Sequence, residues 1–328
     1  MANADQVKAL VKSHAEGDDT RFYSVALQVA ARAARGGQAH FAQDLRDLVD
    51  DLRKNTERRG QRRDAPIPVA QPRGDLVGLL SVSYPTTCMA DLVLDPEVRD
   101  QLQRVTLEQR QHDRLRAQGF RALRRVLLIG PPGTGKTLSA SALAGELRLP
   151  LFVIRLDGLI TKYMGETAAK LRLVFDALAE TRGVYLFDEV DALGGERSRD
   201  NDVGEIRRVL NSFLQFLEQD QSDSLLVAAT NHPQLLDRAM FRRFDAVIQY
   251  PLPTAVVARD VIRNRLANIR LGRIAWARID QAATGLSHAE ITLAAERAAK
   301  DTILAGDDAV GTARLVSALR ERHSRTGA

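Results

Sequence analysis

Cysteine, tryptophan and lysine are scarce in this sequence. It contains one cysteine, Cys88, one tryptophan and only 5% aromatic residues. A single cysteine cannot form an internal disulfide, and no histidine or second cysteine stands near it at metal-ligand spacing, so we expect a small buried hydrophobe and no redox chemistry. No apolar run approaches the roughly 18 residues that a membrane span requires, and the first residues lack the pattern of a secretory signal. We therefore expect a cytoplasmic protein with no membrane partner.

Positive charge comes almost entirely from arginine. Lys and Arg together number 47, of which only 7 are Lys, and the formal net charge is +5. The excess is concentrated in residues 53–63, RKNTERRGQRR, and a basic run of this kind is usually a solvated linker. Nucleic acid is therefore not the expected partner, although binding through this run stays open as an alternative.

A chain of 328 residues is long enough for two or three compact units. Apolar residues repeat at helical spacing in three stripes over residues 1–54, which predicts a small N-terminal helical bundle. The periodicity does not give this bundle a role, and its function as an adaptor is a hypothesis. Residues 55–74 combine proline, glycine and charge, as linkers do. We expect a large α/β subdomain over residues 75–253 and a helical lid over residues 254–328, where no strand pattern remains.

Five apolar runs alternate with amphipathic segments in the middle of the chain. Buried strands that alternate with helices predict a parallel, doubly wound sheet. The runs are residues 125–130, 151–156, 184–189, 225–231 and 246–252. The predicted fold class is therefore α/β, with a parallel five-stranded sheet.

The segment GPPGTGKT follows the first of these runs and opens a helical segment. It fits the G-x-x-x-x-G-K-S/T pattern of P-loop NTPases, in which glycines let backbone N–H groups surround phosphate oxygens and the helix N-terminus adds a positive dipole. We expect Lys136 to meet the β and γ phosphates of ATP and Thr137 to hold Mg²⁺. The predicted nucleotide-binding residues of this segment are Gly130, Pro131, Pro132, Gly133, Thr134, Gly135, Lys136, Thr137 and Leu138.

Two further predicted strands end in polar residues. Asp188 and Glu189 follow four apolar residues, and buried carboxylates are costly without a metal or a partner. We expect Asp188 to hold the hydrated magnesium ion and Glu189 to polarise the attacking water. Asn231 ends the next strand and is expected to orient that water against the γ-phosphate. A simple turn or cap residue is the competing interpretation of Asn231.

Arg242 and Arg243 stand side by side just before the last predicted strand. Guanidinium groups complement the equatorial oxygens of a transferring phosphoryl group and stabilise the charge that spreads over them. The two arginines are therefore candidate catalytic residues. The alternative is a surface pair bonded to acids.

Taken in order, GPPGTGKT, LFDEVDAL, AATN and LDRAMFRRFD resemble the motifs of the AAA+ ATPases, and the pattern is close to the branch of katanin, spastin and the ESCRT-disassembly ATPases. The resemblance covers roughly residues 90–305. It implies a Walker A loop at 130–137, a Walker B pair at Asp188 and Glu189, and a first sensor at Asn231. It also implies that Arg242 and Arg243 are arginine fingers, which reach the nucleotide of a neighbouring subunit in a ring, usually a hexamer.

The same resemblance points to residues around the base. Residues 91–105 resemble the family's segment that lies against adenine, which makes Val93 and Leu94 candidates for base contact. GLSHAEI, residues 285–291, resembles the lid segment, with Glu290 in place of the usual Asp. Within it, His288 is a candidate for stacking near adenine or for capping a helix.

Lys162, Tyr163 and Met164 lie in the segment TKYMGET. In resembling ATPases such a loop projects into a central channel and grips an extended polypeptide, a task for which an aromatic face and a flexible thioether are suited. The alternative is that Tyr163 packs on its own helix. Residues 194–202 would line the lower channel by the same resemblance, but by composition they form only a charged surface loop.

The resemblance thus implies an ATPase with ATP and Mg²⁺ as cofactors, whose homo-oligomeric ring unfolds, threads or remodels a protein substrate. Small bacterial ATPases of this type resemble partners of a separately encoded subtilisin-like serine protease, including in plasmid competition and anti-phage defence. Such a protease is therefore a further expected partner. The alternatives are a nucleic-acid-associated ATPase and a nucleotide-driven assembly switch.

Overall fold

The computed structural model describes residues 43, 74–159, 164–193, 203–236 and 238–326. The predicted N-terminal bundle and nearly all of the predicted linker lie outside these residues. All described residues except Gln43 belong to one compact unit, Val69–Ala328. No helix in the described ranges is both long and apolar enough to cross a membrane.

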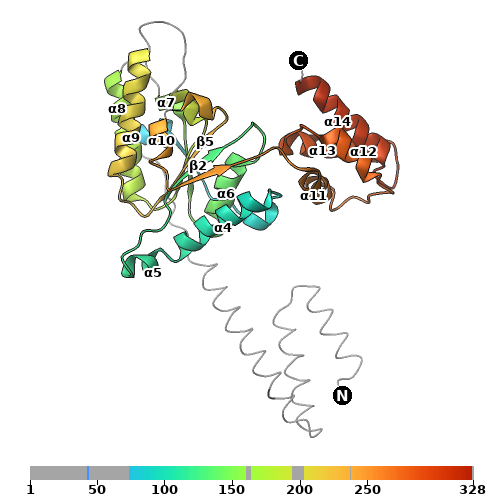
Figure 1. Cartoon of the computed structure of the whole chain (residues 1–328), viewed down its shortest axis with the longest axis horizontal. Helices are drawn as coiled ribbons and strands as arrows, with labels where there is room; N and C mark the ends of the chain where they lie inside the picture. The colour runs from blue at the N-terminus through green and yellow to red at the C-terminus, as the bar shows by residue number, and fades with distance from the viewer. Residues whose placement is uncertain (1–42, 44–73, 160–163, 194–202, 237, 327–328) are drawn as a thin grey trace. The chain divides into compact units, whose positions relative to one another are not determined.

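A six-stranded sheet with the order β1-β3-β4-β5-β2-β6 forms the centre of the α/β part (Figure 1). All five predicted strands are present, and they pair in parallel with one another. The sixth strand, β1, is antiparallel to β3 at the sheet edge and was not predicted. The strands are β1 (Leu80–Ser83), β2 (Arg125–Ile129), β3 (Leu151–Ile154), β4 (Val184–Phe187), β5 (Leu225–Thr230) and β6 (Ala246–Gln249).

Helices cover both faces of this sheet, which is why its central strands are apolar along almost their whole length. Leu127 and Ile129 of β2 belong to the core beneath α8 (Met164–Glu180) and α9 (Val203–Gln219). Val126 and Leu128 belong to the opposite core, beneath α4 (Pro96–Arg110) and α6 (Lys136–Leu147). Figure 1 shows these two helix pairs on opposite sides of the sheet. Successive side chains of a strand point to opposite faces, so a strand between two helical layers must be apolar at every position.

Four helices with a core of their own follow the sheet. Thr254 caps the first of them by accepting a hydrogen bond from the amide of Val257. The core between these helices is rich in alanine, which lets their backbones approach closely. The helices are α11 (Ala255–Arg265), α12 (Trp276–Ala283), α13 (His288–Leu304) and α14 (Thr312–Thr326). We refer to them together as the lid.

Short elements connect these layers. They are α5 (His112–Ala117), α7 (Leu156–Leu159), α10 (Arg238–Phe241), η1 (Gly74–Gly78), η2 (Met89–Asp91), η3 (Val190–Leu193) and η4 (Pro233–Leu235). Cys88 lies just before η2 and is half-buried, with its thiol 3.5 Å from the carbonyl oxygen of Thr86. The expectation that Cys88 is a fully buried hydrophobe was therefore wrong.

Candidate active site

The loop from Gly130 to Gly135 connects the end of β2 to the start of α6, and two of its glycines are required by its shape. A Cβ atom at Gly130 would lie 2.3 Å from the carbonyl oxygen of Tyr250, so no larger residue fits there. Gly135 precedes α6 with a φ of +100°, in the left-handed region that favours glycine. The loop therefore turns tightly at the helix N-terminus, where the first backbone N–H groups have no partner within the helix.

Lys136 is the first residue of α6 and is only 6% exposed. Its Nζ donates hydrogen bonds to the carbonyl oxygens of Gly130 at 2.7 Å and Pro131 at 2.9 Å. Burial lowers the pKa of its ammonium group, while the negative charges of Asp188 and Asp191 act in the opposite direction. The lysine charge is thus held at the loop by neutral oxygens, which phosphate oxygens can replace.

Thr137 and Asp188 meet directly beside this lysine. The hydroxyl of Thr137 donates a hydrogen bond of 2.7 Å to a carboxylate oxygen of Asp188, which follows the fully buried strand β4. Oxygen atoms are the ligands that Mg²⁺ prefers, and this ion usually takes only one or two protein ligands beside waters and phosphates. The described residues contain no cluster of three or more His, Cys, Asp or Glu side chains that could hold a metal. The pair therefore fits a phosphate-bound Mg²⁺ site.

Glu189 has an unusual backbone conformation, with a φ of +53°. Its amide donates a hydrogen bond of 3.0 Å to Asp188, and its side chain is exposed. A non-glycine residue in this region costs about 1–3 kcal/mol. The turn separates the two acids, so that Asp188 faces Thr137 while Glu189 remains at the open surface.

Asp191 takes part in this site, although the sequence analysis assigned it no role. Its carboxylate accepts a hydrogen bond of 2.7 Å from the hydroxyl of Thr230 at the end of β5, and its charge acts on Lys136. The one sequence signal for Asp191 as a site residue is its position three residues after Asp188 in the segment LFDEVDAL.

Asn231 follows Thr230 directly and is half-buried. β5 lies between β4 and β2, and the three strands are parallel. Asn231 therefore follows β5 at the carboxyl ends of the strands, where the Walker B acids and the phosphate loop also lie. The cap residue of the following η4 is His232. Asn231 therefore does not cap η4, while the turn interpretation and the role of Asn231 toward water both stay predictions.

A cavity of about 330 Å³ lies beside the phosphate loop. Six of the predicted residues line it, namely Val93, Leu94, Thr134, Gly135, Leu138 and His288. Its wall also includes Val261, Asn264, Arg265 and Thr292 of the lid, which the sequence analysis did not single out. Asn264 donates a hydrogen bond of 3.4 Å to the carbonyl of Asp91, so residues 173 positions apart close the cavity.

His288 is the first residue of α13, and Ser287 is its cap, so the capping interpretation of His288 was wrong. Both ring nitrogens of His288 are buried, and neither has a hydrogen-bond partner among the described residues. Burial lowers the pKa of the ring, with Asp95 acting in the opposite direction. Burial therefore favours the neutral ring, which has one hydrogen-bond donor and one acceptor.

The lid also contacts the phosphate loop itself. The amide of Ala289 donates a hydrogen bond of 3.0 Å to the carbonyl oxygen of Gly133. A Cβ atom at Gly133 would lie only 2.6 Å from the hydroxyl of Ser287. The start of α13 and the phosphate loop therefore touch through their backbones.

Arg242 and Arg243 differ in their surroundings. Arg242 is exposed, whereas Arg243 forms an ion pair of 2.6 Å with Glu218 at the end of α9. The carbonyl of Arg243 accepts a hydrogen bond of 3.4 Å from Arg125, the first residue of β2. The phosphate loop follows the last residue of β2, at the carboxyl ends of the parallel strands. Both arginines therefore lie at the opposite, amino-terminal ends of these strands.

The predicted channel residues are only partly within the described structure. Lys162, Tyr163 and residues 194–202 lie outside it. Met164 is described by its backbone only, as the first residue of α8.

Comparison with known proteins agrees with this geometry. The family model "ATPase family associated with various cellular activities (AAA)" matches residues 126–252. The chain is similar to the uncharacterized AAA family ATPase y4kL of Sinorhizobium fredii, at 33% identity over 93% of this chain and 90% of that protein. It is also similar to ATP-dependent zinc metalloprotease FtsH 1 of Methylacidiphilum infernorum, at 36% identity over 62% of this chain, although this region is only 33% of that relative. In structure it is similar to the crystal structure of the FIGL-1 AAA domain, with a TM-score of 0.59, 26% identity and coverage of 74% of this chain and 85% of that one.

Proposed function

The chain belongs to the AAA family of ATPases, and from this premise we propose that it forms a homo-oligomeric ring, a hexamer, that unfolds, threads or remodels protein substrates. The reaction of the family is the hydrolysis of ATP to ADP and phosphate. The ring and the protein substrate are the proposal, which the following observations support.

In this proposal, each residue near the phosphate loop has a separate role in ATP hydrolysis. Lys136 neutralises oxygens of the β and γ phosphates, and Thr137 and Asp188, whose side chains are hydrogen-bonded to each other, would hold Mg²⁺. Mg²⁺, when bound, would neutralise charge on the phosphates. Glu189 polarises the attacking water, and Asn231 orients it.

The position of the arginine pair is the single observation that carries the ring. Arg242 and Arg243 precede β6, and the phosphate loop packs against Tyr250, beyond the other end of β6. Four strand residues separate these edges by about 13 Å, at roughly 3.3 Å per residue. A guanidinium group stabilises the transferring phosphoryl group only by direct contact. These arginines can therefore act on a nucleotide only if that nucleotide belongs to another copy of the chain.

Mixing two inactive variants tests this arrangement. A Lys136→Ala subunit lacks the phosphate contact but keeps its arginines, whereas an Arg242→Ala, Arg243→Ala subunit keeps its nucleotide site. Each variant alone should be nearly inactive. A mixture should recover ATPase activity, because a site of the second variant can then receive arginines from the first. The measurement is phosphate release per subunit as the ratio of the two variants is changed.

The control is a mixture of Lys136→Ala with Glu189→Gln, in which no site gains the missing water-activating carboxylate from a neighbour. Recovery in the first mixture alone supports an active site completed by two subunits. If the first mixture stays inactive while wild-type turnover per subunit is unchanged by dilution, the ring proposal is wrong.

Two finer parts of the proposal are supported by resemblance. The adjacency of Arg242 and Arg243 favours the branch of katanin, spastin and the ESCRT-disassembly ATPases. Partnership with a separate subtilisin-like serine protease, in bacterial defence or plasmid competition, rests on the resemblance to small bacterial ATPases of this type. The protease partnership is tested by adding the purified candidate protease to the ATPase and a folded substrate, where degradation should require ATP.

A further inference from the structure

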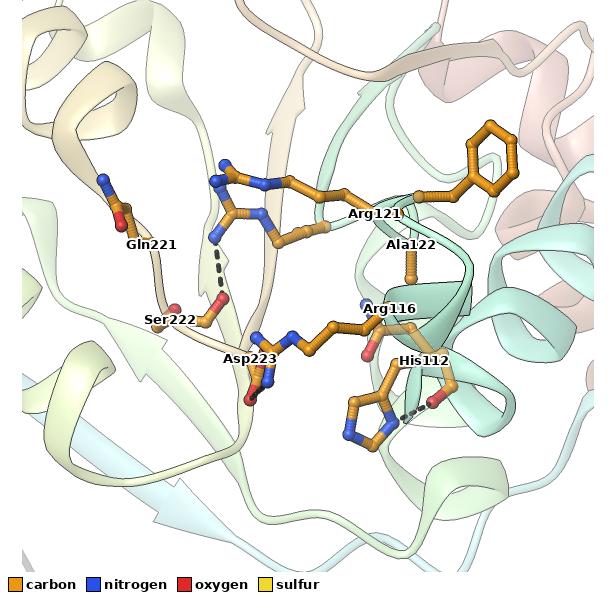
Figure 2. Close-up of a pocket in the computed structure, with 11 residues that line it drawn as sticks. His112, Arg116, Arg121, Ala122, Gln221, Ser222 and Asp223 are labelled. Carbon is orange, nitrogen blue, oxygen red and sulfur yellow. Dashed lines mark hydrogen bonds and ion pairs between the residues drawn. The ribbon is translucent and has the colours of Figure 1, made fainter. Parts of the chain in front are cut away.

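A hollow with basic walls lies at the sheet edge opposite the phosphate loop (Figure 2). It has a volume of about 300 Å³. Its walls are α5 with the segment that leads into β2, and the segment of residues 221–223 that leads into β5. The residues used below are Arg116, Phe120, Arg121, Arg124 and Asp223. We call this the Phe120 hollow.

Arg124 is a fixed part of the wall of this hollow. It is 7% exposed, and its guanidinium donates hydrogen bonds to the carbonyls of Ser222 at 2.7 Å and Asp220 at 2.8 Å. Its pKa is lowered chiefly by burial, with Asp220 opposing this and with the charges of Arg125 and Arg121 adding to it. A buried arginine with this many contacts is a rigid element and not a free side chain.

Arg121 gives the hollow its uncompensated positive charge. Arg116 is paired with Asp223 at 2.7 Å, whereas Arg121 is exposed and forms no ion pair within the described part of the chain. Figure 2 shows the Arg121 side chain extending across the hollow toward Gln221 and Ser222. The hollow therefore presents a guanidinium that an acidic group can bind.

The rim of the hollow is apolar and continues into a second one. Phe120 is 66% exposed, and it also lines an adjoining hollow of about 570 Å³ together with Arg121 and Leu107, which is 55% exposed. In addition, the buried Oε1 of Gln109 in the first hollow has no hydrogen-bond partner among the described residues. A small anion would fill one hollow only. A polypeptide segment with apolar and acidic side chains fits both.

The lid carries a segment of this composition. At the end of α13, Ile303 is 64% exposed and Leu304 is 85% exposed, the highest value among the large hydrophobic residues described. Gly306 then turns the chain, and the exposed acids Asp307 and Asp308 follow. Asp307 is paired with Arg314, whereas Asp308 has no ion pair in the described ranges. Apolar side chains and an available carboxylate thus stand side by side.

We propose that residues 303–308 of one copy dock in the Phe120 hollow of the next copy, with Ile303 and Leu304 on Phe120 and Asp308 on Arg121. This inference rests on the proposed ring, in which the arginine edge of one copy faces the nucleotide of its neighbour. The amide of Arg124 donates a hydrogen bond of 3.0 Å to Asp245, two residues after Arg243, so the hollow lies on that same edge. The neighbour's lid lines its own nucleotide cavity with α11 and the first turns of α13. The docking segment follows the other end of α13, which extends about 24 Å from there at 1.5 Å per residue.

Charge reversal and restoration test the contact. Sedimentation velocity of the full chain, in a Glu189→Gln background with ATP, gives the concentration of half-assembly. Arg121→Glu and Asp308→Arg should each raise this concentration about 5-fold, the scale of an exposed ion pair. The combined variant should return to within about 2-fold of the parent, because the pair is rebuilt in reverse. Phe120→Ala should raise it about 10-fold, since an aromatic anchor contributes more than a rim charge.

Arg278→Glu is the matched control, because it makes the same change of charge at an exposed position of α12. It should leave assembly unchanged. If the parent assembles and Arg121→Glu and Phe120→Ala assemble equally well, the docking proposal is wrong and the ring stands. If the combined variant assembles no better than the single ones, the pairing of Arg121 with Asp308 is wrong. A parent that stays monomeric at every concentration with ATP overturns the ring itself.

Discussion

At the scale of single residues, the backbone conformation of Glu189 sets the direction of its carboxylate relative to that of Asp188. The φ of +53° turns it away from Asp188 although the two are adjacent in sequence. A regular strand would also send neighbouring side chains in opposite directions, but it would point one of them into a buried face. The strained turn keeps both acids at the edge where β4 ends.

Replacing Glu189 by Gln removes a proton acceptor and keeps the size and shape of the side chain. We expect ATP hydrolysis to fall by about 10²- to 10⁴-fold, the usual contribution of a general base, with ATP affinity little changed. Phosphate release and binding of a fluorescent ATP analogue measure the two effects. Glu180→Gln, at the exposed end of α8, is the control and should hydrolyse normally. Wild-type turnover in Glu189→Gln would contradict the assignment.

The phosphate-site residues could be predicted from sequence because each belongs to a short local pattern. The loop and the Walker B pair need only a strand and a helix around them, and both are present. The wall of the base cavity could not be predicted in the same way, because Asn264 meets Asp91 across 173 residues. His288 was partly misjudged because a histidine beside a serine leaves open which residue caps the helix, and the hydrogen bond to Ser287 decides it.

At the scale of elements, an aromatic cluster connects β4 to the helices that cover it. The ring of Phe187 lies 5.1 Å from that of Phe213 in α9, and Phe175 of α8 lies 5.9 Å from Phe213. Phe187 directly precedes Asp188. The position of the Walker B acids therefore depends on packing between these two helices and the strand.

Phe213→Ala should show this dependence. Phe213 is fully buried, and removing such a ring leaves a cavity that costs about 3–5 kcal/mol. We expect the midpoint of urea unfolding to fall clearly, as followed by circular dichroism. Leu235→Ala, at a position that is 39% exposed, should change the midpoint little. Equal midpoints for the two variants would show that the cluster does not support the sheet.

Burial also differs between the strands that could be predicted from the sequence and β1, which could not. β2, β3, β4 and β5 are apolar runs that are buried along almost their whole length, because helices cover both of their faces. β6 is less buried but begins with three apolar residues. β1 has four residues, two of them serines, and its exposure alternates along the strand. β3, β4 and β6 are equally short, so the mixed composition of β1 is what makes it indistinguishable from a loop before β3 is known as its partner.

At the scale of the whole molecule, the channel proposal separates hydrolysis from mechanical work. Tyr163→Ala should leave basal ATP hydrolysis within about 2-fold of wild type, because Tyr163 is not among the phosphate-site residues, but should abolish grip on the substrate. Unfolding of a tagged fluorescent protein measures the second effect. Tyr163→Phe keeps the aromatic face and should retain most of the activity.

The alternatives give different results in the same assays. An assembly switch would keep its function in Tyr163→Ala. A nucleic-acid-associated ATPase would be stimulated by DNA, with a steep loss of stimulation as salt is raised, whereas a threading ring should respond to unfolded protein. Stimulation by DNA alone would contradict the channel proposal.

The contact between Ala289 and Gly133 joins the lid to the phosphate loop through main-chain atoms alone. Replacements elsewhere leave both atoms of this hydrogen bond in place, whereas proline at position 289 would remove the donating N–H and a larger residue at Gly133 would meet the hydroxyl of Ser287. Any movement of the phosphate loop would therefore be passed directly to the first turn of α13. A small rotation there would become a larger displacement at the other end of the helix, where Leu304 lies.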